Sequence, residues 1–401
     1  MRMTPRRVLS FFFISIFSLT AGENCKPGPG PGPSREAGTP TKMSAIVLFA
    51  VGDVRASESF AGSKGRKLKP GDIIQGDQTI NVGNRSLCDL QIRDAKGAFV
   101  IRLNESTRVK LSAVKFPRHK TFEVSIYRGN ALFRMNSTGE ERLRVVTPTA
   151  AAFVRGTSFQ VKVAEDGKSK IGVHEGEVMM LPRIPAVQNI PRKVVESSTT
   201  LSRITDQLYN WRKMVKAGHE TTTDGSYLNG LVQNSPQLTR TLSLPAMRAV
   251  RYGSDGKPEQ IKQAIRVAKK ELDNPATQKK ILASFEKTKP NDVLPPARRI
   301  DAAKFRREIK QYDELVPLTA KELASDAAAR AAIKQRTKKN YEALLQSMAR
   351  LMKRKVDTLK LIEGETLRGV IIQKGRDYMV LTPDGKRFVR EEDLAEIRFP
   401  Q

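Results

Sequence analysis

The stretch Val145-Val-Thr-Pro-Thr-Ala-Ala-Ala-Phe-Val-Arg-Gly-Thr-Ser-Phe-Gln-Val161 decides the fold of this chain, together with Val173-His-Glu-Gly-Glu-Val178 twelve residues further on. The first segment is rich in β-branched and aromatic residues, which favour extended backbone. Gly156-Thr157 interrupts the first segment, and Glu175-Gly176 supplies a tight turn in the second. We therefore expect strands joined by tight turns in this part of the chain.

The same pattern extends over residues 43–183, where apolar residues alternate with polar ones and Gly, Asn and Asp recur between the runs. One run shows the alternation well, with Cys88, Leu90 and Ile92 on one face and Leu87, Asp89 and Gln91 on the other. Period-two alternation with regular turns predicts an all-β module, built as a sandwich, a barrel or a short solenoid.

Six short pieces of this region, in order and at compatible spacing, resemble the FecR domain, an all-β module of bacterial envelope proteins. The pieces are Val51-Gly-Asp-Val54, Leu68-x-x-Gly-Asp-x-Ile74, Arg93-Asp94 with Gly97, Tyr127-Arg-Gly-Asn-Ala-Leu132, Arg155-Gly-Thr-x-Phe159 and Glu175-Gly-Glu-Val178. The residues that carry the family signature, to which we assign a structural role, are Gly71, Asp72, Gly129, Arg155, Gly156, Thr157, Phe159, Glu175 and Gly176.

The resemblance implies a fold and a compartment but no ligand. Known regulators of the family sense a signal in the periplasm and control a sigma factor through a cytoplasmic N-terminal segment and a membrane helix. We find neither feature in this sequence, so we expect only the sensing or scaffolding part of that role.

Residues 1–24 have the features of a signal peptide. Arg2, Arg6 and Arg7 precede a short apolar run that ends at Ala21. A membrane-spanning helix needs roughly 20 apolar residues, whereas a signal peptide uses a shorter run. We therefore expect an exported protein that is periplasmic or anchored to the outer membrane.

Cys25 is the candidate lipid anchor. It precedes a Gly/Pro-rich tether over residues 25–42, in which proline removes backbone donors and glycine adds conformational freedom. The preceding Gly22-Glu23-Asn24 departs from the small residues usual before a lipidated cysteine. Lipidation of Cys25 is left open.

Three further segments follow the β module. Residues 184–257 predict a partly ordered connector, in which a short helix capped near Ser197 runs through Val215. Residues 258–355 predict a basic helical region, because apolar residues recur at helical spacing opposite Lys262, Arg266, Lys269 and Lys270. Thr319-Ala-Lys-Glu322 predicts a capping box that opens a long helix.

Residues 356–401 hold five short apolar runs separated by turns, which resemble a small SH3-like or Sm-like barrel. The fold class we expect is a multidomain α+β chain with an all-β FecR-like domain, a basic helical segment and a C-terminal small β-barrel.

The formal charge of +29 is the unusual total of this chain, and it predicts attraction to polyanions. Nucleic acid is disfavoured, because aromatic residues that could stack on bases are nearly absent from the basic helices, and Phe305 and Tyr341 fall on apolar stripes. The expected partner is a protein or an anionic envelope glycan or lipid.

Catalytic chemistry has little support in the sequence. Of three histidines, His174 is the best placed, beside Glu175 at a turn, and we interpret it as a surface turn residue. We find no metal-ligand spacing and no phosphate-binding loop. We expect a non-enzymatic protein with no cofactor, metal or small-molecule substrate. The alternatives are a nucleic-acid binder that uses the basic helices and the barrel, and, last, a hydrolase centred on His174.

Overall fold

The computed structural model describes residues 39–41, 43–58, 65–115, 120–136, 141–223, 225–251, 258–374, 376–383 and 385–398. The expected signal peptide, Cys25 and nearly all of the expected tether lie outside the described residues. Contacts divide the chain into residues 1–35 and a compact unit of residues 36–401, and all described residues belong to the second.

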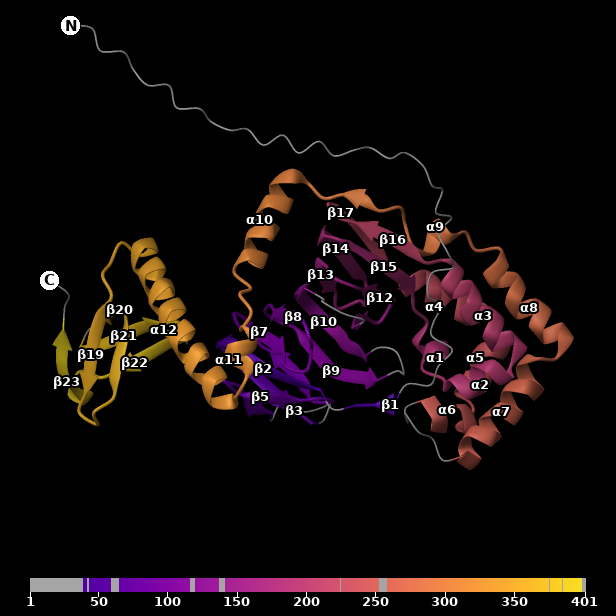
Figure 1. Cartoon of the computed structure of the whole chain (residues 1–401), viewed down its shortest axis with the longest axis horizontal. Helices are drawn as coiled ribbons and strands as arrows, with labels where there is room; N and C mark the ends of the chain where they lie inside the picture. The colour runs from indigo at the N-terminus through magenta and orange to yellow at the C-terminus, as the bar shows by residue number, and fades with distance from the viewer. Residues whose placement is uncertain are drawn as a thin grey trace, which may run out of the picture. The chain divides into compact units, whose positions relative to one another are not determined.

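Two large sheets form the β region (Figure 1). Sheet A runs in the order β4 (Arg66–Lys67), β3 (Val54–Ser57), β6 (Thr79–Val82), β9 (Arg108–Lys115), the first half of β10 (Lys120–Asn136), β11 (Arg142–Val146), β12 (Ala150–Val154), β15 (Glu177–Pro182) and β16 (Lys213–Lys216), with β1 (Thr39–Pro40) also on β9. Sheet B runs in the order β5 (Ile73–Gln75), β2 (Ser44–Val51), β7 (Leu87–Ile92), β8 (Ala98–Leu103), the second half of β10, β13 (Ser158–Val163), β14 (Ser169–Glu175), β17 (His219–Thr223) and β18 (Arg298–Arg299). Of these ladders, only that between β10 and β11 is parallel.

The long strand β10 belongs to both sheets. Its first half pairs with β9 in sheet A, and its second half pairs with β8 and β13 in sheet B. The change takes place at Gly129, whose φ of +97° is a conformation that side chains rarely adopt. A Cβ atom at Gly129 would lie only 2.4 Å from Cα of Thr107. A glycine is therefore needed where β10 passes from one sheet to the other.

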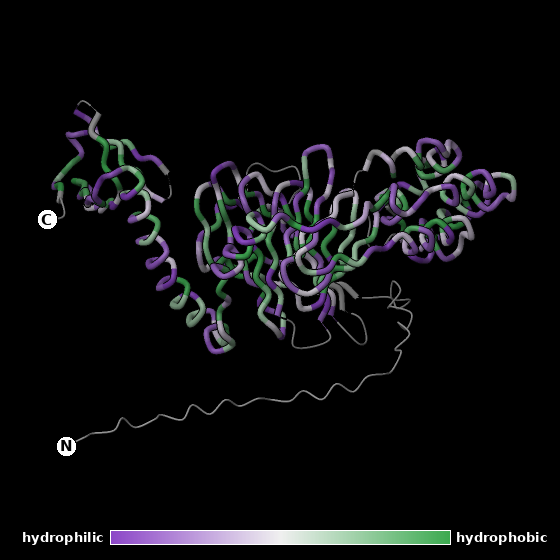
Figure 2. The backbone as a smooth tube through the Cα atoms, turned by 90° about the horizontal axis from the view of Figure 1, so that it is seen from above, coloured by the Kyte–Doolittle hydropathy of each residue, from purple (hydrophilic) through white to green (hydrophobic). Residues whose placement is uncertain are grey.

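One hydrophobic core lies between the two sheets. Phe99 of sheet B packs edge-on against Phe122 of sheet A, with ring centroids 6.0 Å apart. Cys88, Leu90 and Ile92 all lie in this core, so the predicted alternation along β7 is confirmed. Hydrophobic stretches run along many of these strands (Figure 2).

Helices that follow β15 build a second core. They are α1 (Pro185–Gln188), α2 (Arg192–Ser197), α3 (Thr199–Asn210), α4 (Gly225–Gln233), α5 (Pro236–Ser243), α6 (Pro245–Arg251), α7 (Pro258–Leu272), α8 (Pro275–Glu286) and α9 (Pro290–Val293). Trp211 and Phe285 lie in parallel planes in this core, with centroids 6.2 Å apart. The stretch 184–257, which we expected to be a partly ordered connector, thus contributes helices to this core and two strands to the sheets.

The predicted helix through Val215 is wrong beyond Asn210. α3 ends there, and residues 213–216 form β16 on the edge of sheet A. Met214 is 44% exposed and Val215 is fully buried against the β core, a two-residue alternation that suits an edge strand. Pairing with β15 therefore overrides the local helix signal.

The rest of the described chain comprises α10 (Ala302–Asp313), α11 (Ala320–Leu323), α12 (Asp326–Leu351) and a small sheet. The predicted capping box of Thr319 and Glu322 is present, but it opens only the single turn of α11. The long helix begins after a second cap at Ser325. The sequence signal was correct for the cap and wrong for the helix that it starts.

The five predicted C-terminal strands are all present. They are β19 (Asp357–Leu361), β20 (Thr366–Lys374), β21 (Asp377–Thr382), β22 (Gly385–Val389) and β23 (Leu394–Arg398), arranged in the order β22-β21-β20-β19-β23. Within the described residues β22 and β23 share no ladder, so the strands form one open five-stranded sheet, and the expected SH3-like or Sm-like barrel is not confirmed. An α+β chain with a large β region and a second small sheet is confirmed.

Gly129→Ala tests the constraint on β10. We expect a loss in the free energy of unfolding larger than the roughly 1–3 kcal/mol of a strained φ alone, because the new Cβ would also clash with the backbone of Thr107. Urea unfolding measures it. Gly230→Ala in α4 is the control, since no atom lies within 4 Å of its Cβ position, and it should be neutral or stabilising. Equal effects of the two substitutions would contradict the constraint.

Candidate functional site

The outer face of sheet B is covered by a later part of the same chain. We call residues 301–336 the strap; it contains α10, α11 and the start of α12. Its contacts begin near β17 and β14 at one side of the sheet and end at β7 and β2 toward the other (Figure 1). Both faces of sheet B are therefore buried, one by sheet A and one by the strap.

His174 of β14 is the most enclosed polar group under the strap. Its side chain has no exposed surface, and its Nε2 lies 3.1 Å from a carboxylate oxygen of Glu308 on α10. The ring of Phe305 stacks on the imidazole at 5.2 Å, and that of Tyr312 lies at 4.8 Å. Our interpretation of His174 as a surface turn residue is wrong, because α10 covers it.

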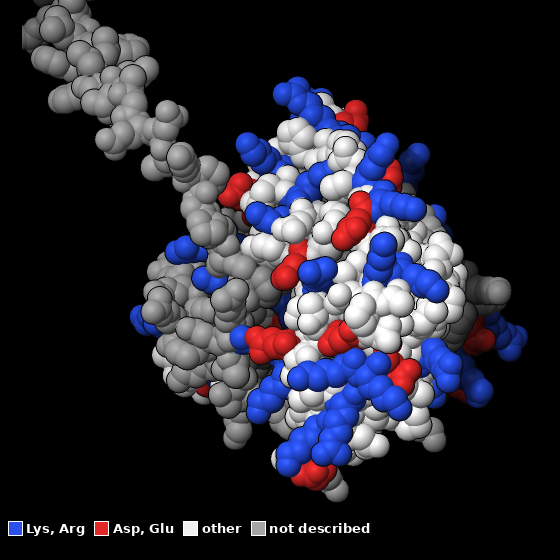
Figure 3. Space-filling view, turned by 90° about the vertical axis from the view of Figure 1, so that its right-hand side faces the viewer, with Lys and Arg blue, Asp and Glu red and all other residues white. Residues whose placement is uncertain are grey.

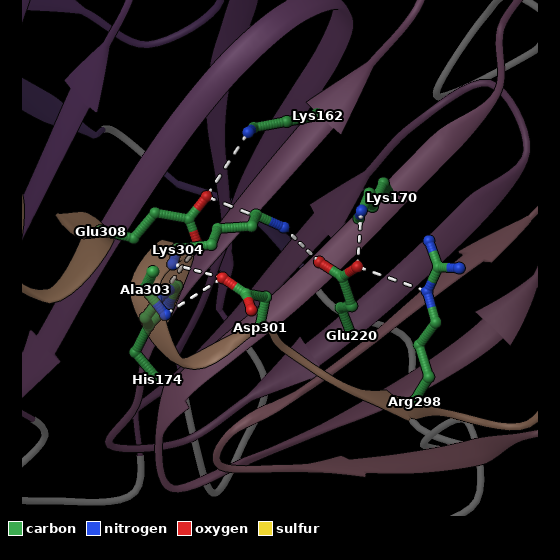
Figure 4. A network of polar contacts seen from close by, with 9 residues as sticks. All are labelled: Lys162, Lys170, His174, Glu220, Arg298, Asp301, Ala303, Lys304 and Glu308. Carbon is green, nitrogen blue, oxygen red and sulfur yellow. Dashed lines mark hydrogen bonds and ion pairs between the residues drawn. The ribbon is translucent and has the colours of Figure 1, made fainter. Parts of the chain in front are cut away.

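Two carboxylates link α10 to sheet B through lysines (Figure 4). Glu220 of β17 pairs with Lys304 of α10 and, at 2.7 Å, with Lys170 of β14. Glu308 lies 3.6 Å from Nζ of Lys162 and 3.9 Å from Nζ of Lys304. Lysines from the sheet and the helix thus share the same two acids.

The pKa values of both acids respond to these neighbours. Burial alone would raise the pKa of Glu308, but the hydrogen bond from His174 and the charges of Lys304 and Lys162 outweigh it and lower the pKa. Burial also acts to raise the pKa of Glu220, and the hydrogen bonds and charges of Lys170 and Lys304 lower it overall. Both groups therefore stabilise the strap as carboxylates.

Further along the strap, an arginine of β8 joins two acids. Arg102 donates to both carboxylate oxygens of Asp89 on β7, at 2.8 and 2.9 Å, and to Glu314 at 2.6 Å. Burial acts to lower the pKa of Arg102, but Asp89 and Glu314 raise it overall, so the guanidinium stays charged. Arg134 of β10 donates to the carbonyl oxygen of Tyr312 at 2.9 Å.

The far end of the strap is held by an amide and by apolar contacts. The side chain of Gln91 accepts from the backbone N–H of Leu318 at 2.7 Å and donates to its carbonyl oxygen at 3.2 Å. Ile46 packs against Leu318 and Ile333. The strap is thus held by a row of polar contacts with apolar residues beside them.

This arrangement is built for attachment and gives no support to catalysis. A base must reach substrate, and the His174 ring is enclosed by two aromatic rings and a carboxylate. In the part of the chain that the structure describes, no group of three or more His, Cys, Asp or Glu could hold a metal ion.

The structure brings two parts of the family signature together. Arg155-Gly156-Thr157 joins β12 of sheet A to β13 of sheet B, and Glu175-Gly176 joins β14 of sheet B to β15 of sheet A. A Cβ atom at Gly176, where φ is +74°, would lie 2.6 Å from Cγ2 of Thr157. The Ser158 hydroxyl donates to Glu175 at 2.7 Å. These residues form adjacent corners at which the chain changes sheets.

The remaining signature residues lie elsewhere. Phe159 is in the core, stacked on Phe133 at 4.7 Å. Gly71 has a φ of +90°, and the carboxylate of Asp72 accepts from Lys69 N–H at 2.9 Å and from Arg66 at 2.7 Å. Arg155 is exposed, whereas Thr157 is buried. Apart from Phe159, these signature residues thus lie at turns and corners, and the structural role assigned to them stays a prediction.

The strap was missed by sequence reasoning, although a signal for it exists. The strands β2, β8 and β10 contain continuous apolar runs, Ala-Ile-Val-Leu-Phe-Ala, Ala-Phe-Val-Ile and Ala-Leu-Phe. A continuous run is typical of a strand buried on both faces, whereas a strand with one wet face alternates. These runs indicated a cover over sheet B, but they could not identify which segment supplies it.

Glu308→Gln tests the electrostatic part of the attachment. Because the folded pKa of Glu308 is lowered, its stabilisation is present above the unfolded pKa of about 4.3 and is lost as pH falls through the folded pKa. The variant should therefore melt below the wild type at pH 7, with a smaller difference near pH 3. Glu286→Gln, at an exposed position of α8, is the control. A pH-independent difference would contradict the assignment.

Asp89 and Arg102 provide a double-mutant cycle. Arg102→Met alone leaves a buried carboxylate without its partner and should cost roughly 3–5 kcal/mol. Asp89→Leu with Arg102→Met removes both charges and should recover much of that loss in urea unfolding. Purely additive effects would show that the pair is not coupled.

Two crystal structures of a candidate anti-sigma factor from Parabacteroides distasonis, at 1.65 and 2.50 Å, each match with 18% sequence identity and a TM-score of 0.25. Each match covers 37% of this chain and 55% of that chain, so the chain spans about half the length of the protein it matches. No curated protein matches the chain. No described helix is both long enough and apolar enough to cross a membrane.

The family comparison is more direct. Residues 78–179 match the model described as FecR protein, and they extend from β6 to β15. Four of the six sequence pieces lie within this match, so the predicted resemblance to the FecR family is confirmed for residues 78–179.

Proposed function

We propose that this chain is a non-catalytic protein of the bacterial cell envelope, in which the FecR domain senses or scaffolds by binding a protein or an anionic glycan or lipid. The observation that carries the proposal is the FecR match over residues 78–179. The family is one of regulatory envelope proteins rather than enzymes.

The geometry of the domain supports a binding role. The signature residues lie at turns and corners of the sheets, and His174 is enclosed under α10. A partner would therefore meet the outer face of sheet A or the edges, loops and helices of the unit, because both faces of sheet B are already covered.

We propose that residues 1–24 are a signal peptide, 25–42 a tether and 43–183 the FecR-like β domain. Residues 184–257 would be the connector, 258–355 the basic helical region and 356–401 the small C-terminal β unit. For experiments the β region has to keep its later strands, because β16, β17 and β18 complete sheets A and B. A fragment of residues 43–183 would also expose the face that the strap covers.

The charge favours an anionic partner. Removal of residues 1–24 would take away three arginines and one glutamate, so most of the +29 belongs to the exported form. The comparisons give no support to the nucleic-acid alternative.

Intact mass, N-terminal analysis and membrane fractionation of the natively expressed protein test the proposal. We expect loss of residues 1–24 and recovery in the envelope fraction. An added lipid mass on Cys25 would identify an anchored lipoprotein, and cleavage without lipid would identify a soluble exported protein; both outcomes support export. An uncleaved Met1 in the cytosol would overturn the proposal and bring nucleic-acid binding forward.

A further inference from the structure

We propose that the exposed face of α7 is the surface by which this protein lies on an anionic membrane. We call Lys262, Arg266, Lys269 and Lys270 the basic face. This inference rests on the proposed function, since it identifies where an envelope protein with an anionic partner makes its contact.

The basic face is a continuous stripe. Lys262, Arg266 and Lys270 follow one another at intervals of four residues, so they stack along one side of the helix, and Lys269 lies one turn from Arg266. All four are exposed. The opposite side of α7 packs into the helical core through Ala264, Ala268 and Leu272, which have no exposed surface. The 15-residue helix, about 22 Å long, is therefore fixed with its cations outward.

Most of this charge is uncompensated. Glu259 pairs with Lys262 at 2.9 Å, but both side chains are exposed and such pairs are weak. Within the described residues, Arg266, Lys269 and Lys270 take part in no ion pair. Further exposed cations, Lys193 and Arg248, lie on α2 and α6, the helices that pack against α7. In Figure 3, Lys and Arg side chains lie side by side in the lower part of the view, where Figure 1 places α7.

The shape and chemistry of the basic face fit a membrane surface. Three of its four cations are lysines, which act as mobile point charges and suit a diffuse layer of phosphates better than one fixed group. The face lies on the outer side of a helix, so it offers a convex surface to a flat layer of charge. Each Lys or Arg near an anionic leaflet contributes about 1 kcal/mol.

The contact is electrostatic and does not require insertion. No large apolar residue of α7 is strongly exposed, because its apolar side is already used in the helical core. A few kcal/mol from charge alone give weak, reversible attachment, and stable attachment takes a second signal. A lipidated Cys25 would hold the protein beside the bilayer and raise the local concentration of the basic face.

Vesicle sedimentation tests the proposal with residues 36–401, which form one compact unit and exclude the apolar N-terminal run. The probes are phosphatidylcholine vesicles with and without phosphatidylglycerol, at low and high ionic strength. The wild type should bind only the anionic vesicles and should be released by salt, because screening shortens the range of the attraction.

The test variant carries Lys262→Gln, Arg266→Gln, Lys269→Gln and Lys270→Gln. It should bind anionic vesicles at least about tenfold more weakly than the wild type, since each cation contributes about 1 kcal/mol. The matched control removes the same charge from exposed positions of α12, through Arg330→Gln, Lys334→Gln, Lys338→Gln and Lys339→Gln. It should lose far less. Thermal unfolding checks that both variants remain folded.

Three outcomes would overturn the inference. Equal losses in the two variants would mean that net charge drives binding without a specific face. Equal binding of the wild type to neutral and anionic vesicles would exclude an electrostatic contact. Failure to bind vesicles, together with tight binding to a soluble acidic glycan, would replace the membrane with a polymer. Binding through net charge alone, or binding to a soluble glycan, would leave the proposed function intact. The proposed function itself is decided by the separate test of export and localisation.

Discussion

The passage of β10 from one sheet to the other is the constraint on which the rest of the structure depends. β10 has 17 residues, and β8 and β13 both pair with its second half. If all of β10 stayed in sheet A, sheet B would lose the strand that joins β8 to β13. The passage needs a left-handed residue with no side chain, and it brings Gly129 against Thr107. A positive φ recurs at Gly156 and Gly176, where the chain again changes sheets, and at Gly176 a Cβ atom would also meet Thr157. Glycines at such positions explain why a signature made mostly of small and turn residues can identify a fold without identifying a ligand.

The strap is needed because sheet B has apolar residues on both of its faces. Ile46, Val100 and Leu132 point away from the main core and need a cover. The strap provides it, and Arg102, which is held by Asp89 of the neighbouring strand, pairs with Glu314 of the strap. A buried ion pair adds little net stability, and its clearest contribution is to exclude other alignments. We interpret the polar row as the feature that sets the position of α10 along the sheet.

Much of the fold was predictable because it depends on local patterns. Most strands within residues 43–183 and all five C-terminal strands followed from alternation and turn residues, and the capping box at Thr319 was recognised from two side chains. The errors fall where a distant segment decides the outcome. Lys213–Lys216 forms a strand because β15 lies beside it, and His174 is buried because α10, more than a hundred residues later, covers it. The expected C-terminal barrel is not confirmed, because five strand signals do not specify whether the edge strands β22 and β23 meet. For the candidate site, His174 was noted in the sequence, but its contacts with α10 could not be predicted.

The order of the strands along the chain also has a consequence for biogenesis. Sheets A and B begin at residues 39 and 44, yet their last strands come at residues 213–216 and 298–299, and the cover of sheet B follows from residue 301. Contacts between segments so far apart form slowly. As the chain is synthesised from its N-terminus, the apolar outer face of β2, β8 and β10 would remain uncovered until the residues of the strap have been made. The nascent protein therefore passes through a long interval in which a hydrophobic sheet face is open to water, and a holding chaperone would be most useful during that interval.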